Sequence, residues 1–378
     1  MRFKQYHCPW STYHLSDIAE VVGGGTPDTT VPSLWNGDIQ WFTPTEVGHQ
    51  KYVSKSARTI TQLGLQKSSA KKLPAGSILL SSRATIGECS IAQRECTTNQ
   101  GFQNLIPKND TNNEFLYYLA QTKKHHFIKY ASGSTFLEIS NSEIRKTKCT
   151  VPGTEEQTQI AAFLSALDDR ISVQNKIIED LKILKKELCN KVFSKGTAVR
   201  LGELIEEVTV RNKSNACDNV LSVSNKMGFI KQSEQFEDRT IASENKSNYK
   251  VVTKGCFAYN PARINVGSIA LLSSHSVGII SPMYVCFKAK NVLDSTYLSF
   301  YYQSNFFARE LQKKLEGSVR QCLTYENMRE TIIPYVDIER QREIATTLNR
   351  FTMLIATEEK CLKALQKQKT YFLNAMFI

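Results

Sequence analysis

The sequence predicts an α+β protein built as a pseudo-two-fold internal repeat: two mixed α/β domains separated by two long antiparallel helices that form a coiled coil. Two observations lead to this fold class. Two long helical segments carry matching apolar stripes, and the segments that precede them share the same order of short motifs. Self-similarity at a fixed spacing indicates that each copy is one structural unit.

The apolar stripes are the strongest of these signals. Apolar residues alternate at spacings of four and three, the pattern of helices that pair along one face. Matching positions are 184 residues apart, as Ile160 and Ile344 are. The residues expected to pair are Ile160, Leu164, Leu167, Ile171 and Leu181 in the first copy and Ile344, Leu348, Phe351, Ile355 and Leu365 in the second. Polar residues interrupt each stripe twice, at Gln174 and Lys185 and again at Glu358 and Lys369.

Capping residues mark where the two helices begin and end. Thr154 and Gln157 fit a capping box, in which both side chains satisfy free backbone donors. Asp337 can cap the second helix, and Lys195-Gly196 fits a helix stop. We therefore expect domains at 1–152 and 196–335 and helices within 153–195 and 336–378. At about 1.5 Å per residue, the first helix is roughly 55 Å long.

The globular segments repeat three short elements. Gly76–Leu80 and Gly255–Tyr259 are expected as strands, and Phe115–Tyr118 and Tyr297–Phe300 as short helices. Gly-Ser motifs at Gly133 and Gly317 then precede strands that end near Pro152 and Pro334. In the first copy, Trp35 and Trp41 are expected in the core, on either side of a turn at Asn36-Gly37.

The composition limits the function classes. A formal net charge of +12 favours a polyanionic partner. A membrane surface is disfavoured because residues 1–10 are polar and no apolar run approaches ~18 residues. The ten cysteines include no Cys-x-x-Cys pair, so we expect reduced thiols in a cytoplasmic protein and no metal site.

Catalytic motifs are missing from the sequence. A methyltransferase needs a Gly-rich cofactor loop and an Asn/Asp-Pro-Pro-aromatic element, and Asn260-Pro261-Ala262-Arg263 lacks the second proline and the aromatic residue. There is no P-loop, and no hydrolytic constellation can be assembled from the six histidines and the carboxylates. We therefore expect a protein without catalytic residues or cofactors of its own.

Several motifs resemble one known family. Gly23–Pro27, Trp35–Pro44 and Ser82–Gly87 resemble a target-recognition domain of type I restriction-modification specificity subunits, and Tyr259–Ser268 resembles the matching element of a second one. Glu156-Gln157 with Ile160-Ala161, and Arg340-Gln341 with Ile344-Ala345, resemble the starts of the two conserved helices. Arg340 stands where the family usually has an acidic residue.

The resemblance implies a function and a set of partners. Each domain would read one half of a bipartite, asymmetric site in double-stranded DNA, and the helices would set the gap. Two methyltransferase subunits with S-adenosylmethionine would bind this scaffold, and motor-nuclease subunits with ATP and magnesium would join them. Two alternatives remain open: an orphan or phase-variable specificity subunit used for epigenetic regulation, and a two-headed architectural DNA binder without an enzymatic partner.

Polar residues in corresponding loops are the candidates for DNA contact. Arginine can reach phosphates or guanine edges, and amides can read adenine. The candidates are Arg83, Thr85, Asn99, Gln100 and Ser134 in the first domain and Asn260, Arg263, Asn265 and Arg320 in the second.

Overall fold

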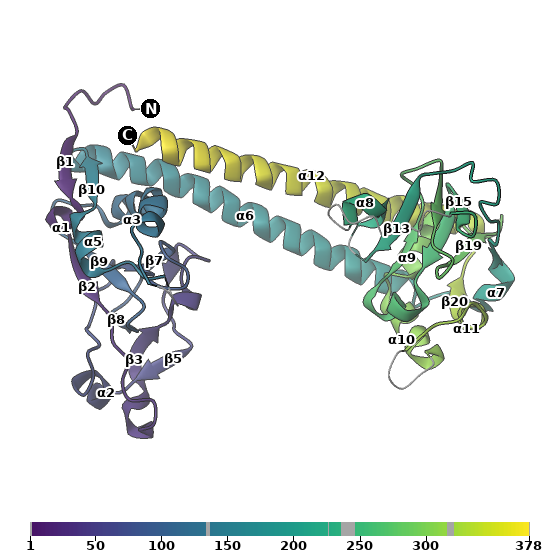
Figure 1. Ribbon diagram of the computed structural model, residues 1–378, viewed down its shortest axis with the longest axis horizontal. Coiled ribbons are helices and arrows are strands. Elements are labelled where there is room, and N and C mark those ends of the chain that lie inside the picture. The colour runs from purple at the N-terminus through teal and green to yellow at the C-terminus, as the bar shows by residue number, and fades with distance from the viewer. Residues whose placement is uncertain (1, 134–136, 226, 236–245, 316–320, 378) are drawn as a thin grey trace. The chain divides into compact units, whose positions relative to one another are not determined.

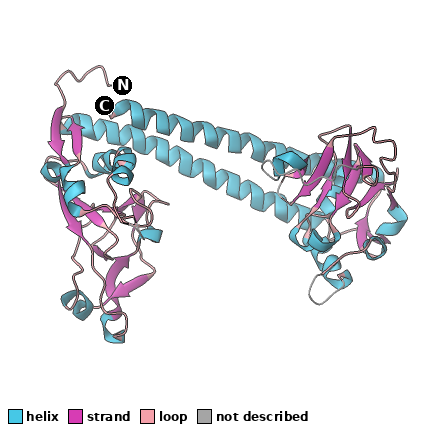
Figure 2. Ribbon diagram, in the orientation of Figure 1, coloured by secondary structure: helices cyan, strands magenta, loops and turns pink. Residues whose placement is uncertain are grey.

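The computed structural model describes residues 2–133, 137–225, 227–235, 246–315 and 321–377. Its contacts divide the chain into two compact units. The first comprises Met1–Asn175 with Cys361–Ile378, and the second comprises Lys176–Lys360. Both units are mixed α/β, as Figure 2 shows.

The first unit is built around two sheets and one antiparallel strand pair. A five-stranded sheet has the order β2 (Ala19–Gly23), β9 (Gln103–Pro107), β6 (Ile78–Leu80), β7 (Cys89–Ala92), β4 (Tyr52–Val53). A three-stranded sheet has the order β5 (Arg58–Ile60), β3 (Trp35–Phe42), β8 (Cys96–Thr98), and β1 (Ser11–His14) pairs with β10 (Lys148–Val151). The helices are α1 (Leu15–Ile18), η1 (Pro32–Leu34), η2 (Pro44–Glu46), α2 (Gln62–Gln66), α3 (Asn113–Thr122), α4 (Lys124–Lys129) and α5 (Asn141–Lys146).

One local prediction in this unit is wrong. Asn36-Gly37 does not form a turn, because β3 runs from Trp35 to Phe42 and its register against β5 shifts between Trp35 and Ile39. The extra residues form a bulge, in which Asn36 has a φ of 62°. The core prediction for the tryptophans is confirmed, because Trp35 and Trp41 are buried with their rings edge to face.

The second unit also contains two sheets and one antiparallel strand pair, but each of its sheets has four strands. One sheet has the order β12 (Ile205–Glu207), β19 (Val285–Ala289), β16 (Cys256–Tyr259), β17 (Ile269–Leu271), and the other β14 (Gly228–Lys231), β13 (Val220–Ser224), β18 (Val277–Ile280), β15 (Lys250–Thr253). β11 (Thr197–Arg200) pairs with β20 (Ile332–Tyr335). The helices are α7 (Leu201–Leu204), α8 (Gln232–Gln235), η3 (Pro261–Val266), α9 (Ser295–Tyr301), α10 (Asn305–Lys314) and α11 (Tyr325–Arg329).

Equivalent hydrogen bonds show that the repeat is structural. Leu15 N donates to Thr147 O at 2.9 Å, where α1 follows the β1–β10 pair. Leu201 N donates to Thr331 O at the same distance, where α7 follows the β11–β20 pair. The two copies therefore have the same backbone arrangement where each globular domain begins.

Two helices of 39 residues, α6 (Thr154–Val192) and α12 (Ile338–Met376), pair within both units (Figure 1). In the first unit the start of α6 packs against the end of α12, with the Phe163 and Phe372 ring centroids 4.9 Å apart. In the second unit Lys182 of α6 forms an ion pair with Glu359 of α12 at 2.6 Å. Both pairings are antiparallel, so the predicted fold class is confirmed. Across the described residues, no helix is long and apolar enough to cross a membrane.

The predicted pairing residues lie on the inner faces of these helices. Seven are buried and three are half-buried. The buried residues are Ile160, Leu164, Leu167, Ile344, Leu348, Ile355 and Leu365, and the half-buried ones are Ile171, Leu181 and Phe351. In the first unit this stripe is continuous with the core of the globular domain, because Leu164 and Leu167 share one apolar cluster with Phe115 and Met376.

The start of α6 differs from the predicted capping box. Gln157 is buried and does not cap its own helix; its Nε2 donates to Pro152 O at 2.9 Å and to Asp110 O at 3.2 Å. Its Oε1 accepts from Asn112 N, the N-cap residue of α3, at 3.0 Å. The side chain therefore ties the long helix to the loop before α3.

The start of α12 has the same buried glutamine together with the predicted cap. Gln341 Nε2 donates to Val336 O at 2.8 Å and to Val292 O at 3.1 Å, and its Oε1 accepts from Asp294 N at 2.8 Å. Asp337 Oδ1 accepts from Arg340 N at 2.9 Å, as predicted for a cap. In each unit, one buried amide thus joins the start of a long helix to the adjoining globular domain.

Candidate nucleic-acid interface

Four of the candidate residues in the first unit lie on two neighbouring loops. Arg83 and Thr85 lie between β6 and β7, and Asn99 and Gln100 lie between β8 and β9. The loops are joined where Ser82 N donates to the backbone oxygen of the residue after Gln100, at 2.9 Å. The structure therefore brings these four predicted side chains into one region.

Backbone geometry holds the two loops in shape. Ala84 and Gly87 have φ values of 63° and 84°, so the first loop bends through two left-handed positions. In the second loop, Asn99 Oδ1 accepts from Gly101 N at 2.9 Å. That bond occupies the amide oxygen of Asn99. The exposed Gln100 accepts a hydrogen bond from the Thr26 hydroxyl.

Arg83 is held by an ion pair. Its Nε donates to Glu138 Oε2 at 3.0 Å, and the two side chains are 41% and 32% exposed. Because the pair is open to solvent, its net stabilisation is small. Glu138 orients the guanidinium at the surface, and a phosphate can compete with the carboxylate for it.

The candidates of the second unit lie on η3, directly after β16. Asn260 caps this turn, because its Oδ1 accepts from Ala262 N at 3.1 Å. Arg263 and Asn265 are exposed. Within the described part of the chain, the Arg263 guanidinium has no hydrogen bond or ion pair, in contrast to Arg83.

The two loop regions are built on the same frame. Ile139 N donates to Ser82 O at 3.0 Å in the first unit, and Leu323 N donates to Pro261 O at 3.2 Å in the second. Each contact joins the strand-following loop to the segment after a Gly-Ser motif. The candidates Ser134 and Arg320 belong to those motifs and lie outside the described residues.

Arg58 is a further cation that the sequence pattern did not reveal. Its guanidinium carbon lies 3.6 Å from the centroid of the Trp35 ring and 5.7 Å from that of Trp41. The residue is exposed, and stacking on a ring holds a guanidinium flat without neutralising it. The contact depends on the pairing of β3 with β5, which places Arg58 opposite Trp41. No spacing within the sequence signals that pairing.

Comparison with known proteins identifies the family. A family model of the type I restriction modification DNA specificity domain matches residues 8–182 and 197–367. The chain belongs to this family. The two matches correspond to the two copies of the repeat, and the family resemblance seen in the motifs is confirmed. Both copies of the repeat are therefore type I restriction modification DNA specificity domains.

Individual relatives share different extents of the chain. The MjaIX specificity subunit of Methanocaldococcus jannaschii is 40% identical over 188 residues, which cover 49% of this chain and 44% of that protein. The chain thus aligns with less than half the length of this relative. The putative MjaX specificity subunit of the same organism is 24% identical over 402 aligned positions, covering 97% of this chain and 92% of that protein.

Solved structures show the same fold at low identity. A type I S subunit from M. genitalium superimposes with a TM-score of 0.60 at 15% identity, covering 100% of this chain and 99% of the other. A chain from a study of complex assembly in the type I R-M system superimposes with a TM-score of 0.61 at 16% identity, with 97% of both chains covered. These likenesses bear on the fold alone.

Proposed function

We propose that this chain is the DNA-reading subunit of a type I restriction-modification complex and that it recognises a bipartite, asymmetric site. Each globular domain reads one half-site, and the paired helices set the number of base pairs between them. Two methyltransferase subunits dock on this scaffold, and motor-nuclease subunits join for restriction. S-adenosylmethionine, ATP and magnesium are bound by those partners.

One observation carries the proposal: two loop regions have the same backbone frame but different exposed side chains. The frame is the pair of equivalent hydrogen bonds at Ser82 and Pro261. On it the first unit presents an ion-paired Arg83, whereas the second presents an exposed Arg263 for which the described residues provide no ion pair. Proteins read DNA sequence with side chains that contact base edges. Two loops with the same backbone arrangement but different side chains should therefore recognise different half-sites.

The net charge of +12 supports DNA as the ligand. Lysine and arginine that neutralise phosphates release counterions, so affinity falls steeply as salt rises. We expect the complex to lose affinity between low and physiological salt. An affinity that is independent of salt would argue against phosphate contacts and therefore against DNA as the partner.

Methylation mapping tests the complete proposal. The chain is expressed with its candidate methyltransferase subunits in a host without restriction systems, and methylated sites are mapped across the host genome. We expect one bipartite motif with two different halves. Exchanging residues 81–88 for the corresponding loop of a relative should change one half only. The purified chain alone should neither methylate nor cleave DNA.

Co-purification separates the alternatives. A scaffold retains methyltransferase subunits through purification, whereas an architectural DNA binder does not. An orphan or phase-variable specificity subunit retains the methyltransferase and supports methylation but recruits no motor-nuclease. A chain that binds DNA and retains no methyltransferase would contradict the proposal.

A further inference from the structure

Residues 2–10, which precede β1, cover the start of α6 in the first unit. Arg2 forms a two-pronged ion pair with Glu156, with Nε–Oε1 and Nη2–Oε2 both 2.8 Å. Gln5 Nε2 donates to Gln159 Oε1 at 2.7 Å, and the Phe3 ring meets the Phe163 ring edge to face at 6.2 Å. We call the surface formed by Glu156, Gln159 and Phe163 the first groove, and it is occupied by the chain itself.

The second unit has the equivalent surface at the start of α12, and the described residues leave it uncovered. Arg340, Glu343 and Thr347 are 184 residues after Glu156, Gln159 and Phe163. Glu156 is only 3% exposed beneath Arg2, whereas the side chain of Arg340 is 60% exposed. We call this surface the second groove; its volume is about 580 Å³.

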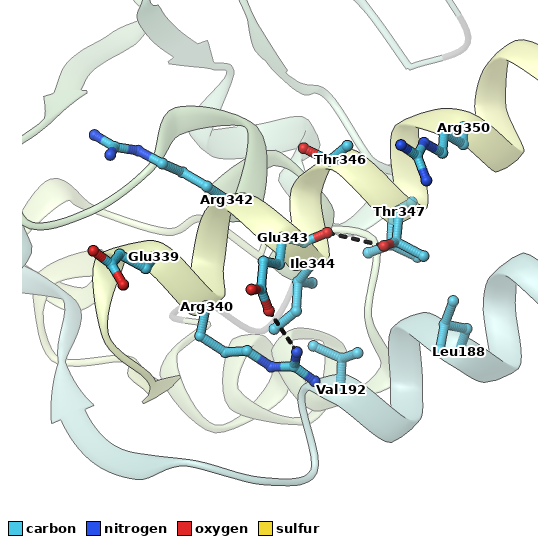
Figure 3. Close-up of a pocket in the computed structure, with 11 residues that line it drawn as sticks. Leu188, Val192, Glu339, Arg340, Arg342, Glu343, Ile344, Thr346, Thr347 and Arg350 are labelled. Atoms are coloured by element: carbon cyan, nitrogen blue, oxygen red, sulfur yellow. Dashed lines mark hydrogen bonds and ion pairs between the residues drawn. The ribbon is translucent and has the colours of Figure 1, made fainter.

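The second groove has an apolar floor and a charged rim. Figure 3 shows Arg340 and Glu343 beside Val192, whereas Arg342 points away from it. The floor is formed by Leu188 and Val192 of α6 and by Ile344 and Leu348 of α12. Thr347 is smaller than the Phe163 that it replaces, which leaves room above this floor. A volume of this size falls within the range of about 300–1,000 Å³ for ligand sites.

The rim is more basic than acidic. Three arginines line the groove against two glutamates: Arg340, Arg342 and Arg350 against Glu339 and Glu343. The Arg340 guanidinium donates to Glu343 at 2.7 Å in an exposed pair (Figure 3). A guanidinium has five donors, so Arg340 can bind a second carboxylate without losing Glu343.

We propose that the second groove binds a short peptide segment of another protein, with an acidic residue for Arg340 and an aromatic residue for the apolar floor. The first groove shows that the same scaffold accepts a short segment with one charged residue and one aromatic residue, folded through a turn in which Tyr6 N donates to Phe3 O at 3.2 Å. The charge at the key position is reversed, from Glu156 to Arg340. The segment 2–10 of a second copy of this chain is therefore disfavoured, because its Arg2 would face Arg340.

A protein segment suits this groove better than a DNA backbone does. Phosphates gain nothing from the apolar floor. A peptide can use both the floor and the arginines. The inference concerns neither DNA reading nor methylation, so it stands or falls separately from the proposed function.

A charge-swap binding experiment tests the inference. The probe is a fluorescent peptide of residues 2–10 with Arg2→Glu and Cys8→Ser, and the comparison peptide retains Arg2. Binding to the full chain is measured by fluorescence anisotropy. We expect the Glu peptide to bind about ten-fold more tightly than the Arg peptide, and Arg340→Glu in the protein to reverse this preference.

Matched variants keep the test decisive. Arg170→Glu changes the same charge on an exposed part of α6 in the first unit and should leave the preference unchanged. Arg340→Gln should abolish it, and this variant serves if Arg340→Glu fails to fold. The inference is overturned if neither peptide binds at about 1 mM, or if the preference is independent of residue 340. Displacement of the peptide by random-sequence duplex DNA, with dependence on Arg340, would assign the groove to DNA.

Discussion

Lys185 and Lys369 occupy equivalent positions in the two copies, but their surroundings differ. Lys369 interrupts the stripe of α12 and pairs with Asp168 of α6 at 2.6 Å, beside the Tyr118 ring. Lys185 interrupts the stripe of α6 and lies 5.2 Å from the Phe300 ring. Thr352 stands where the first unit has Asp168, so no described carboxylate faces Lys185. Burial lowers the pKa of the Lys185 ammonium as a result.

We predict opposite effects when each lysine is replaced by methionine. Lys369→Met should lower the free energy of unfolding by about 1–3 kcal/mol, because Asp168 is 18% exposed and loses its cation. Lys185→Met should be neutral or stabilising, because it removes a charge that burial disfavours. Chemical denaturation of the two variants at pH 7 measures the difference. Equal losses would show that Lys185 has a stabilising partner.

The effect of Lys185 should also depend on pH. Its pKa is lower in the folded protein than the ordinary value of 10.5, so the unfolded chain binds the proton more tightly. The cost of folding is therefore full at neutral pH and disappears as the pH rises from the folded pKa to the unfolded one. Any gain from Lys185→Met should shrink over that range. A gain that is constant with pH would contradict the electrostatic explanation.

Arg263 is the residue for which DNA contact is most directly testable. Arg263→Ala should weaken binding to the mapped site by about 1–3 kcal/mol and, if the contact is to a phosphate, reduce the salt slope by about one. Arg170→Ala removes the same charge from α6 and is the control. Anisotropy titrations at two salt concentrations measure both. Equal losses for the two variants would mean that only net charge matters.

At the scale of elements, the sequence predicts what depends on spacing and misses what depends on tertiary contacts. Apolar alternation locates both long helices to within a few residues, because it reports which face is buried. It cannot show that Gln157 reaches back to Asp110, or that Arg58 stacks on Trp35, because those partners are brought together by folding. Asn36-Gly37 fits both a turn and a bulge. The pairing of β3 with β5 decides between them, and that pairing cannot be seen in the sequence.

The pairing of α6 can be tested with a fragment of residues 1–195. Without α12, Ile160 and Leu164 lose the partners Phe372 and Met376. A second fragment supplies Leu188 and Val192 at the equivalent positions, so two α6 helices should pair antiparallel. Analytical ultracentrifugation should show a dimer, and the double variant Leu164→Glu with Leu188→Glu should be monomeric. A folded monomeric wild-type fragment would show that the stripe is buried within its own unit.

At the scale of the whole molecule, duplication provides one scaffold with two separately variable surfaces. Both copies have the equivalent backbone hydrogen bonds, the buried glutamine at the start of the long helix and the apolar stripe along that helix. The exposed loops, the charge at residues 156 and 340, and the partners of the two lysines differ. Some of these differences lie on exposed surfaces, and others, such as the partners of the lysines, lie between the helices.

If the paired helices set the gap in the recognised site, lengthening both should lengthen the gap. The insertion belongs inside the helices, because α6 ends at Val192 and residues 193–196 form a connection. Seven residues inserted after Gln174 and after Glu358 preserve the alternation of the stripe and add about 10 Å at 1.5 Å per residue. With base pairs about 3.4 Å apart, the gap should grow by about three pairs.

Methylation mapping of the insertion variant distinguishes the outcomes. Both half-site sequences should be unchanged, because no residue of either globular domain has been altered. A variant with seven residues inserted into α6 alone shifts one stripe against the other and should lose activity or stability, which controls for the insertion itself. An active double-insertion variant that methylates sites with the original gap would show that the helices do not measure the distance between the two halves.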